Sequence, residues 1–195
     1  MSDTSRRELL KAIAASAMIG PIGLEAAQHV HGIAAQDKSA AGYKPKAFTA
    51  HEYKTLRVLA DLIIPADERG PGAAEAGAPE FVDLLSSQNP RLLAIYTGGI
   101  AWLDHSSQRL NSKDFADASP QQQTALLDLI AYRKNESPML GPGIEFFGWA
   151  RRIVVDAYFT SPAGTKALGY MGNTAVAKFE VPQEAIDYAL KRSPV

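Results

Sequence analysis

The sequence FTAHEYKTLRVLADLIIP, residues 48–65, decides the fold. Thr49 and Glu52 have the spacing of a capping box, in which the threonine oxygen accepts from an early backbone N–H and the glutamate reaches back to the cap. Phe48 and Tyr53 occupy the positions of a hydrophobic staple. Pro65 ends the pattern, because the residue before a proline disfavours helical backbone angles. Together with apolar residues at helical spacing, these signals predict a well-defined helix.

Apolar residues recur at helical intervals in the rest of the chain as well. Ser119 and Gln122 form a second capping box, and Gly98 and Gly99 would let another helix approach closely. No stretch shows sustained two-residue alternation, so we expect an all-α fold, a small irregular bundle of four or five helices with long loops. The further helical segments are residues 81–85, 90–103, 119–131, 144–158 and, near the C-terminus, 182–191.

Composition excludes several classes of function. The 195 residues include 20 Lys and Arg against 21 Asp and Glu, a net charge of −1, so no basic excess exists to bind nucleic acid. Cysteine is absent, which removes disulfides, thiolate metal sites and covalent haem attachment. The glycine-rich, P-loop and H-E-x-x-H motifs of cofactor and zinc sites are missing too. We therefore expect no catalytic residue, no metal and no cofactor in this chain.

The N-terminus resembles a twin-arginine export signal. Arg6 and Arg7 precede Leu9, Leu10 and Lys11, and a mildly apolar stretch then runs to about residue 24. That stretch is too short for a membrane span, which needs roughly 20 apolar residues. We expect residues 1–35 to be a twin-arginine export signal and tether, residues 36–195 to be the helical domain, and the protein to be periplasmic.

Two alternatives for this segment stay open: a cytosolic amphipathic helix with a chance Arg-Arg pair, and an uncleaved signal that tethers the protein to the membrane. The best small-x-small cleavage candidate is Gly32-Ile33-Ala34. Twin-arginine export carries folded proteins, often with a cofactor already bound. Since this chain has no cofactor motif, the cofactor is expected to belong to a passenger.

Several polar residues have both a functional and a structural interpretation. Asp61 and Asp67 flank the Pro65 stop and could bind a cation, but bonding of loop backbone N–H groups is the expected role. His51, in the first turn of its helix, is expected to be exposed or to face a partner. Asp104 and His105 precede two serines, yet helix neighbours do not face one another, so a catalytic triad is not expected.

Three blocks of sequence resemble the small subunit, subunit 3 or gamma, of gluconate 2-dehydrogenase and related flavin-dependent complexes. The first block is the most specific, and together the blocks cover nearly the whole domain in the family's order. The tail from residue 178 does not map onto this pattern. The blocks are FTAHE at 48–52 with LADLIIPAD at 59–67 and PGAAEAG at 71–77, then WLD at 102–104 with Phe115 and residues 119–127, and FF at 146–147 with YFTSP at 158–162 and GYMGN at 169–173.

The resemblance implies an accessory subunit without redox chemistry of its own. Its partner would be a large FAD-containing dehydrogenase subunit of the glucose–methanol–choline type that acts on sugars or sugar acids, often accompanied by a cytochrome c subunit. The alternatives are a free-standing periplasmic helical binding domain, a membrane tether, or an enzyme in which carboxylates and His51 or His105 converge in a pocket. The candidate partner interface lies in the 66–79 loop and the 159–173 segment, at Asp67, Pro71, Glu75, Phe159, Tyr170 and Asn173.

Overall fold

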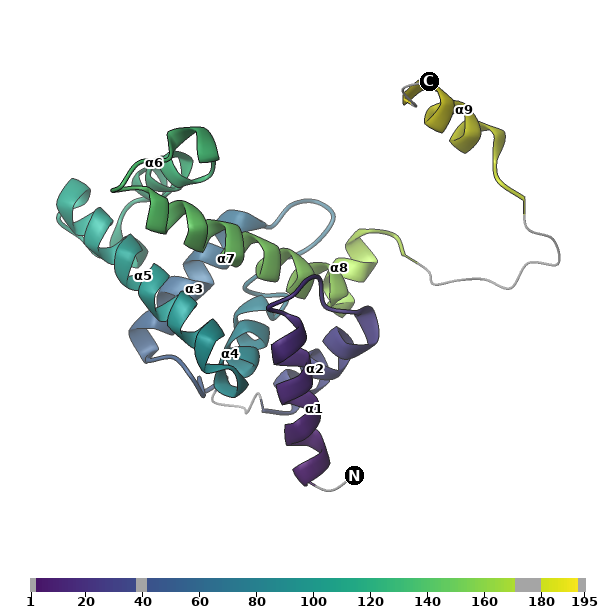
Figure 1. The fold of residues 1–195 in the computed structure, drawn as a ribbon, viewed down its shortest axis with the longest axis horizontal. Helices are drawn as coiled ribbons and strands as arrows, with labels where there is room; N and C mark the ends of the chain where they lie inside the picture. The colour runs from purple at the N-terminus through teal and green to yellow at the C-terminus, as the bar shows by residue number, and fades with distance from the viewer. Residues whose placement is uncertain (1–2, 38–41, 171–179, 193–195) are drawn as a thin grey trace.

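The computed structural model describes residues 3–37, 42–170 and 180–192, and these residues form helices and connecting loops without a β-strand (Figure 1). The predicted all-α class is therefore confirmed. Nine α-helices occur in the described residues, more than the four or five expected, because the N-terminal segment and the chain after residue 160 are helical as well. The helices are α1 Asp3–Ser16, α2 Leu24–Asp37, α3 Ala50–Ile63, α4 Ala78–Gln88, α5 Pro90–Asn111, α6 Pro120–Ile130, α7 Gly141–Thr160, α8 Pro162–Ala167 and α9 Gln183–Arg192.

Both capping boxes are present. In α3, the Thr49 side chain accepts from the Glu52 backbone N–H and the Glu52 carboxylate accepts from the Thr49 N–H. Ser119 and Gln122 repeat this arrangement at the start of α6. These short-range signals satisfy backbone donors that a helix start leaves unpaired. The predicted starts of α3 and α6 are therefore confirmed.

The centre of the body is α4, which packs against α1, α2, α3, α5 and α7 (Figure 1). Every residue from Ala78 to Ser86 is buried, which is the pattern of a helix covered on all sides. The helix begins earlier than predicted. Gly77, with φ 93°, turns the chain into it, and Pro79 sits in its first turn, where a missing N–H costs nothing.

Helices α5 and α7 cross closely because glycine is present at the contact. A Cβ on Gly99 would lie 2.0 Å from the Phe146 ring, whereas one on Gly98 would meet nothing within 4 Å. At the next crossing point, a Cβ on Gly143 would lie 2.5 Å from the Trp102 ring. The expectation of close helix packing is confirmed for Gly99.

Ordered packing begins well before Phe48. Helices α1 and α2 lie against α4, and α2 also packs on α7. Asp83 then holds the chain that follows: its carboxylate accepts from the Tyr43 hydroxyl at 2.6 Å and from three backbone N–H groups of residues 46–48. The segment expected to be a signal and tether is thus a helical hairpin on the body, and its role in export stays a prediction. None of the described helices has the length and apolar character needed to cross a membrane.

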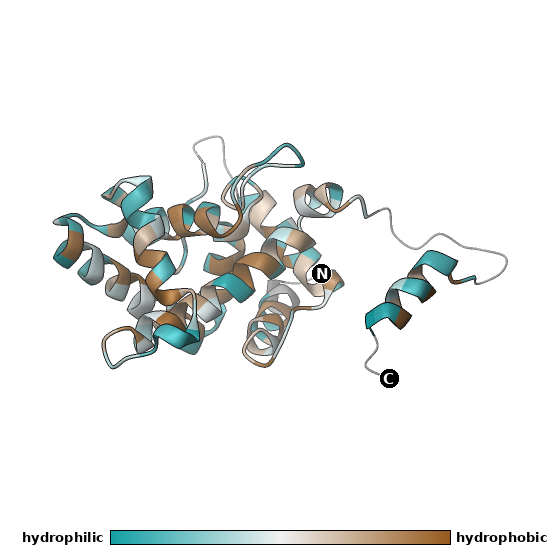
Figure 2. Ribbon diagram, turned by 90° about the horizontal axis from the view of Figure 1, so that it is seen from above, coloured by the Kyte–Doolittle hydropathy of each residue, from teal (hydrophilic) through white to brown (hydrophobic). Residues whose placement is uncertain are grey.

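Hydropathy follows this architecture. Viewed from above, the helices of the body carry brown and teal stretches in alternation, as expected of helices with one apolar face (Figure 2). Helix α9 carries both colours and buries none of its residues.

Candidate partner interface

The two segments expected to form the partner interface lie side by side. The Tyr158 hydroxyl, near the end of α7, donates to the Pro71 carbonyl at 3.1 Å. A Cβ on Gly70 would lie 3.1 Å from that hydroxyl oxygen and 3.4 Å from the Ala167 Cβ in α8. The loop before α4 therefore contacts the end of α7 and α8, although about 90 residues separate them in sequence.

Two aspartates, Asp61 and Asp67, accept hydrogen bonds from the backbone of the 66–79 loop. Asp61 Oδ1 accepts from the Ala74 backbone N–H at 2.8 Å, and Asp67 Oδ1 accepts from the N–H groups of Arg69 and Gly70 at 2.9 and 3.1 Å. These contacts confirm the structural role expected for both carboxylates. A Cβ on Gly72 would lie 2.5 Å from Asp61 Oδ1, so this turn needs a glycine.

On the other side, Ser161 turns the chain from α7 into α8. Its buried hydroxyl donates to the Tyr158 carbonyl at 2.7 Å and accepts from the Gly164 N–H at 3.0 Å. A Cβ on Gly164 would lie 2.0 Å from the Tyr158 carbonyl oxygen. The chain directly after residue 160, which lies outside the predicted helical segments, thus forms the short capped helix α8, Pro162–Ala167.

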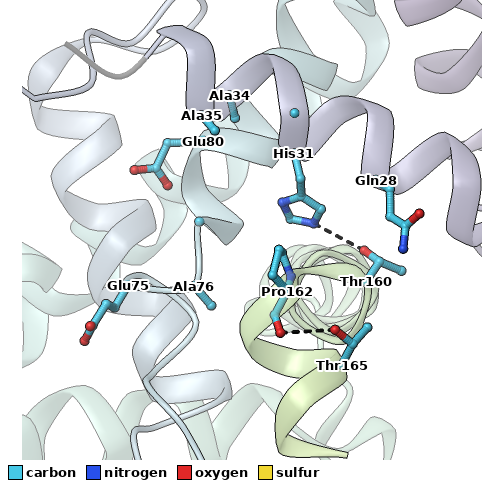
Figure 3. A pocket seen from close by; sticks show the side chains of 12 residues that line it. Gln28, His31, Ala34, Ala35, Glu75, Ala76, Glu80, Thr160, Pro162 and Thr165 are labelled. Atoms are coloured by element: carbon cyan, nitrogen blue, oxygen red, sulfur yellow. Dashed lines mark hydrogen bonds between the residues drawn. The ribbon is translucent and has the colours of Figure 1, made fainter. Parts of the chain in front are cut away.

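A cleft of about 610 Å³ opens where these two segments meet α2 (Figure 3). His31 projects from α2 to the end of α7, with Nε2 3.3 Å from Thr160 Oγ1 and its ring centroid 4.9 Å from that of Phe81. Burial lowers the pKa of the His31 imidazole, and the nearby Ala157 backbone acts in the opposite direction by raising it. This shift favours the neutral imidazole. The lining residues are Gln28, His31, Gly32, Ala34, Ala35, Glu75, Ala76, Gly77, Glu80, Thr160, Pro162 and Thr165.

Two glutamates are among the residues that line the cleft. Glu75 is exposed at the edge of the cleft. Glu80 is buried, and its Oε1 lies 3.7 Å from Nη1 of the Arg57 guanidinium. Burial, and next the charge of Glu80, raises the pKa of the Tyr53 phenol. Small apolar walls beside carboxylates suit an apolar or basic side chain of a protein partner.

The candidate interface residues are mostly accessible. Asp67, Glu75, Phe159 and Tyr170 are exposed, and Pro71 is half-buried. Of these, Glu75 lines the cleft. Asn173 lies outside the described residues. Sequence reasoning missed the wall contributed by α2, because no local pattern reports that an N-terminal helix packs beside a loop 40 residues later.

Of the two histidines considered for an enzyme, His51 contacts a carboxylate of another helix. His51 Nε2 lies 2.7 Å from Asp104 Oδ2, and the other carboxylate oxygen accepts from the Phe115 N–H at 2.9 Å. This pair joins α3 to α5 on the surface, where the His51 side chain is 46% exposed, and His105 is exposed as well. The hydrogen bond with Asp104 raises the pKa of His51. Over the described ranges, no group of three or more His, Cys, Asp or Glu residues could hold a metal ion.

The expected export residues lie on α1. Arg7, Leu9 and Lys11 are exposed, and Lys11 pairs with Glu8 at 2.9 Å, while Leu10 is buried. Arg6 precedes them in the same helix.

Comparison with curated proteins and with solved structures finds no match. The family model of gluconate 2-dehydrogenase subunit 3 matches residues 50–176, more than half of the chain. That range contains α3 to α8, and with them the loop and the α7–α8 turn that border the cleft. The chain therefore belongs to the gluconate 2-dehydrogenase subunit 3 family.

Proposed function

We propose that the chain is a non-catalytic accessory subunit that binds, matures and co-exports a separate FAD-dependent dehydrogenase subunit of the glucose–methanol–choline type. The complex would oxidise CH–OH groups of sugars, polyols or sugar acids and pass electrons to an acceptor such as a cytochrome c subunit. Membership of a dehydrogenase subunit family carries the proposal, because the family name describes one component of a multi-subunit oxidoreductase.

The arrangement of the candidate interface supports docking near the cleft. The loop with Asp67 and Glu75 and the turn with Phe159 form one continuous surface, fixed by the bond between Tyr158 and Pro71. Loops held by internal hydrogen bonds present their exposed side chains with little loss of entropy on binding. An exposed aromatic residue beside a cleft is a frequent anchor in protein interfaces. We assign the flavoprotein to this surface.

Export follows from the same proposal. Arg6 and Arg7 would direct the assembled pair through the twin-arginine translocase, which transports folded cargo. The flavoprotein would acquire FAD in the cytoplasm and need no signal of its own. In the periplasm, the subunit would stay bound as a structural part of the complex.

An affinity pull-down of the tagged full-length chain from its native host tests the proposal. We expect a yellow complex with a flavin absorbance spectrum and dye reduction that depends on a sugar or polyol. The chain purified alone after dissociation should be colourless and inactive. A colourless monomer from the native host would contradict the proposal and favour a free-standing binding domain or a membrane tether.

A further inference from the structure

The N-terminal hairpin, defined as residues 3–37, packs on a face formed by α4 and α7. Helix α1 contacts α4, and α2 contacts both α4 and α7. The family match begins only at residue 50, so the hairpin lies outside the matched domain and covers one of its faces. Its buried apolar residues are Leu10, Ile13, Ala14, Ala17, Ile22, Ala27, Val30 and Ala34.

Two side chains of the domain bind the backbone at the end of α1. The Arg152 guanidinium in α7 donates to the carbonyls of Ala17 and Gly20 at 2.5 and 2.8 Å. The Asn89 amide, between α4 and α5, donates to the Ala14 carbonyl at 2.9 Å. Carbonyls at a helix C-terminus lack partners within the helix, and a cation there is stabilised by the helix dipole. The domain therefore satisfies the groups that the end of α1 leaves open.

The second half of the hairpin is held as well. His31 in α2 lies 3.3 Å from Thr160 Oγ1 through its Nε2, and its ring centroid is 4.9 Å from that of Phe81 in α4. These contacts place polar attachments on both sides of the turn between α1 and α2. The hairpin thus occupies a formed binding site and does not merely cover an apolar face.

The predicted export signal lies on this packed hairpin, where Leu10 is buried while Arg7 and Lys11 are exposed. A translocase must contact the arginine pair and the apolar stretch that follows, yet Leu10, Ile13 and Ala14 face α4 and are buried. One surface cannot contact the domain and the translocase at the same time. We propose that the α4–α7 face is a binding site for the chain's own export segment and keeps it from the translocase until it is released. This inference rests on the proposed function, from which it takes residues 6–11 as an export signal.

The structure also indicates how release would be coupled to assembly. Half of the eight buried apolar residues in the hairpin are alanines, which bury little area each, so the hairpin is held less firmly than a leucine-rich one would be. Gln28, His31 and Gly32 of α2 form one wall of the cleft. A protein that docks there contacts the hairpin directly. A flavoprotein that takes the place of α2 at this wall would displace the hairpin and expose the signal only on assembled cargo.

Hydrogen exchange of the full-length chain tests the binding site. We expect slow exchange over residues 8–20, and exchange faster by roughly tenfold or more in the double variant Arg152→Met, Asn89→Asp, which removes three charge-assisted or amide donors. Aspartate retains the oxygen with which Asn89 caps α5 by accepting from the N–H groups of Arg91 and Leu92. Arg151→Met is the matched control, since Arg151 is exposed on the same helix and should leave exchange unchanged.

A second variant guards against general unfolding. Ile13→Gln alters only the hairpin side and should accelerate exchange over residues 8–20 while α5 and α6 stay protected. The masking step is measured separately, as the rate of twin-arginine export without flavoprotein, which should rise in the double variant. Exchange over residues 8–20 at the rate of a disordered peptide in the unmodified chain would overturn the inference, as would unchanged export of the loosened variant. Export that is insensitive to Arg6→Lys, Arg7→Lys would instead contradict the export route in the proposed function.

Discussion

Asp83 shows how one buried residue can join two parts of the chain. Its side chain accepts four hydrogen bonds, from Tyr43 and from the backbone of residues 46–48, and it is fully buried in α4. Asp83→Ala would leave these donors unpaired, which costs about 2 to 4 kcal/mol of the free energy of unfolding. Urea denaturation measures the change. Asp128→Ala, at an exposed site on α6, is the control and should stay within about 0.5 kcal/mol; equal effects of the two substitutions would contradict this role.

His51 gives a prediction that depends on pH. Its pKa is raised by the hydrogen bond with Asp104, so the protonated form is favoured in the folded state. The stabilisation is present below the ordinary value of 6.5 and is lost as pH rises through the folded pKa. Asp104→Asn should lower the pKa of His51, as followed by NMR titration, and should cost about 0.2 to 1 kcal/mol at pH 5.5 but less at pH 8.5. A pKa that does not change in this variant would show that the pair does not form in solution.

At the scale of elements, Gly99 is one of two glycines that allow α5 and α7 to cross closely. Gly99→Ala would force the Phe146 ring or the helices apart, because the new Cβ would lie 2.0 Å from that ring. We expect a loss of about 1 to 3 kcal/mol in the free energy of unfolding. Gly98→Ala, one residue away, meets no atom within 4 Å and should be stabilising by about 0.5 to 1 kcal/mol. Thermal melts of the two variants should therefore shift in opposite directions, and parallel shifts would contradict the packing.

Among the elements, only features with a local sequence pattern could be predicted. The starts of α3 and α6 were predictable because their capping boxes are local, and the roles of Asp61 and Asp67 followed from the loop they border. The packing of α1 and α2 was not predictable, because it depends on contacts with α4 and α7 that are distant in sequence. Arg152 carried no signal at all: its partners are backbone carbonyls near residue 20, which leave no trace in the pattern of side chains.

For the whole molecule, the candidate site was predictable as two segments but not as one surface. The 66–79 loop and the 159–173 segment stand out in the sequence because helical periodicity does not account for them. Their convergence needs the Tyr158–Pro71 contact, and the cleft needs α2 as a third wall. Neither relation is encoded in local spacing.

Substitutions on this surface should weaken assembly. Phe159 is 37% exposed, and its ring packs edge-on against that of Tyr158, with centroids 5.0 Å apart. Phe159→Ala combined with Glu75→Lys should weaken binding of the flavoprotein roughly tenfold or more, since exposed aromatic anchors carry much of an interface's energy. Flavin recovered per tagged chain measures the effect. Tyr132→Ala, at a 58% exposed aromatic residue outside both segments, is the control and should retain full recovery; full recovery with the double variant would exclude this surface.

The most direct test of the accessory role is to delete this chain from its host and measure sugar-dependent dye reduction in the periplasmic fraction. We predict that activity disappears, returns with the unmodified chain, and does not return with Arg6→Lys, Arg7→Lys, in which the flavoprotein should stay in the cytoplasm. Undiminished periplasmic activity in the deletion strain would contradict the claim that this subunit matures and co-exports a dehydrogenase.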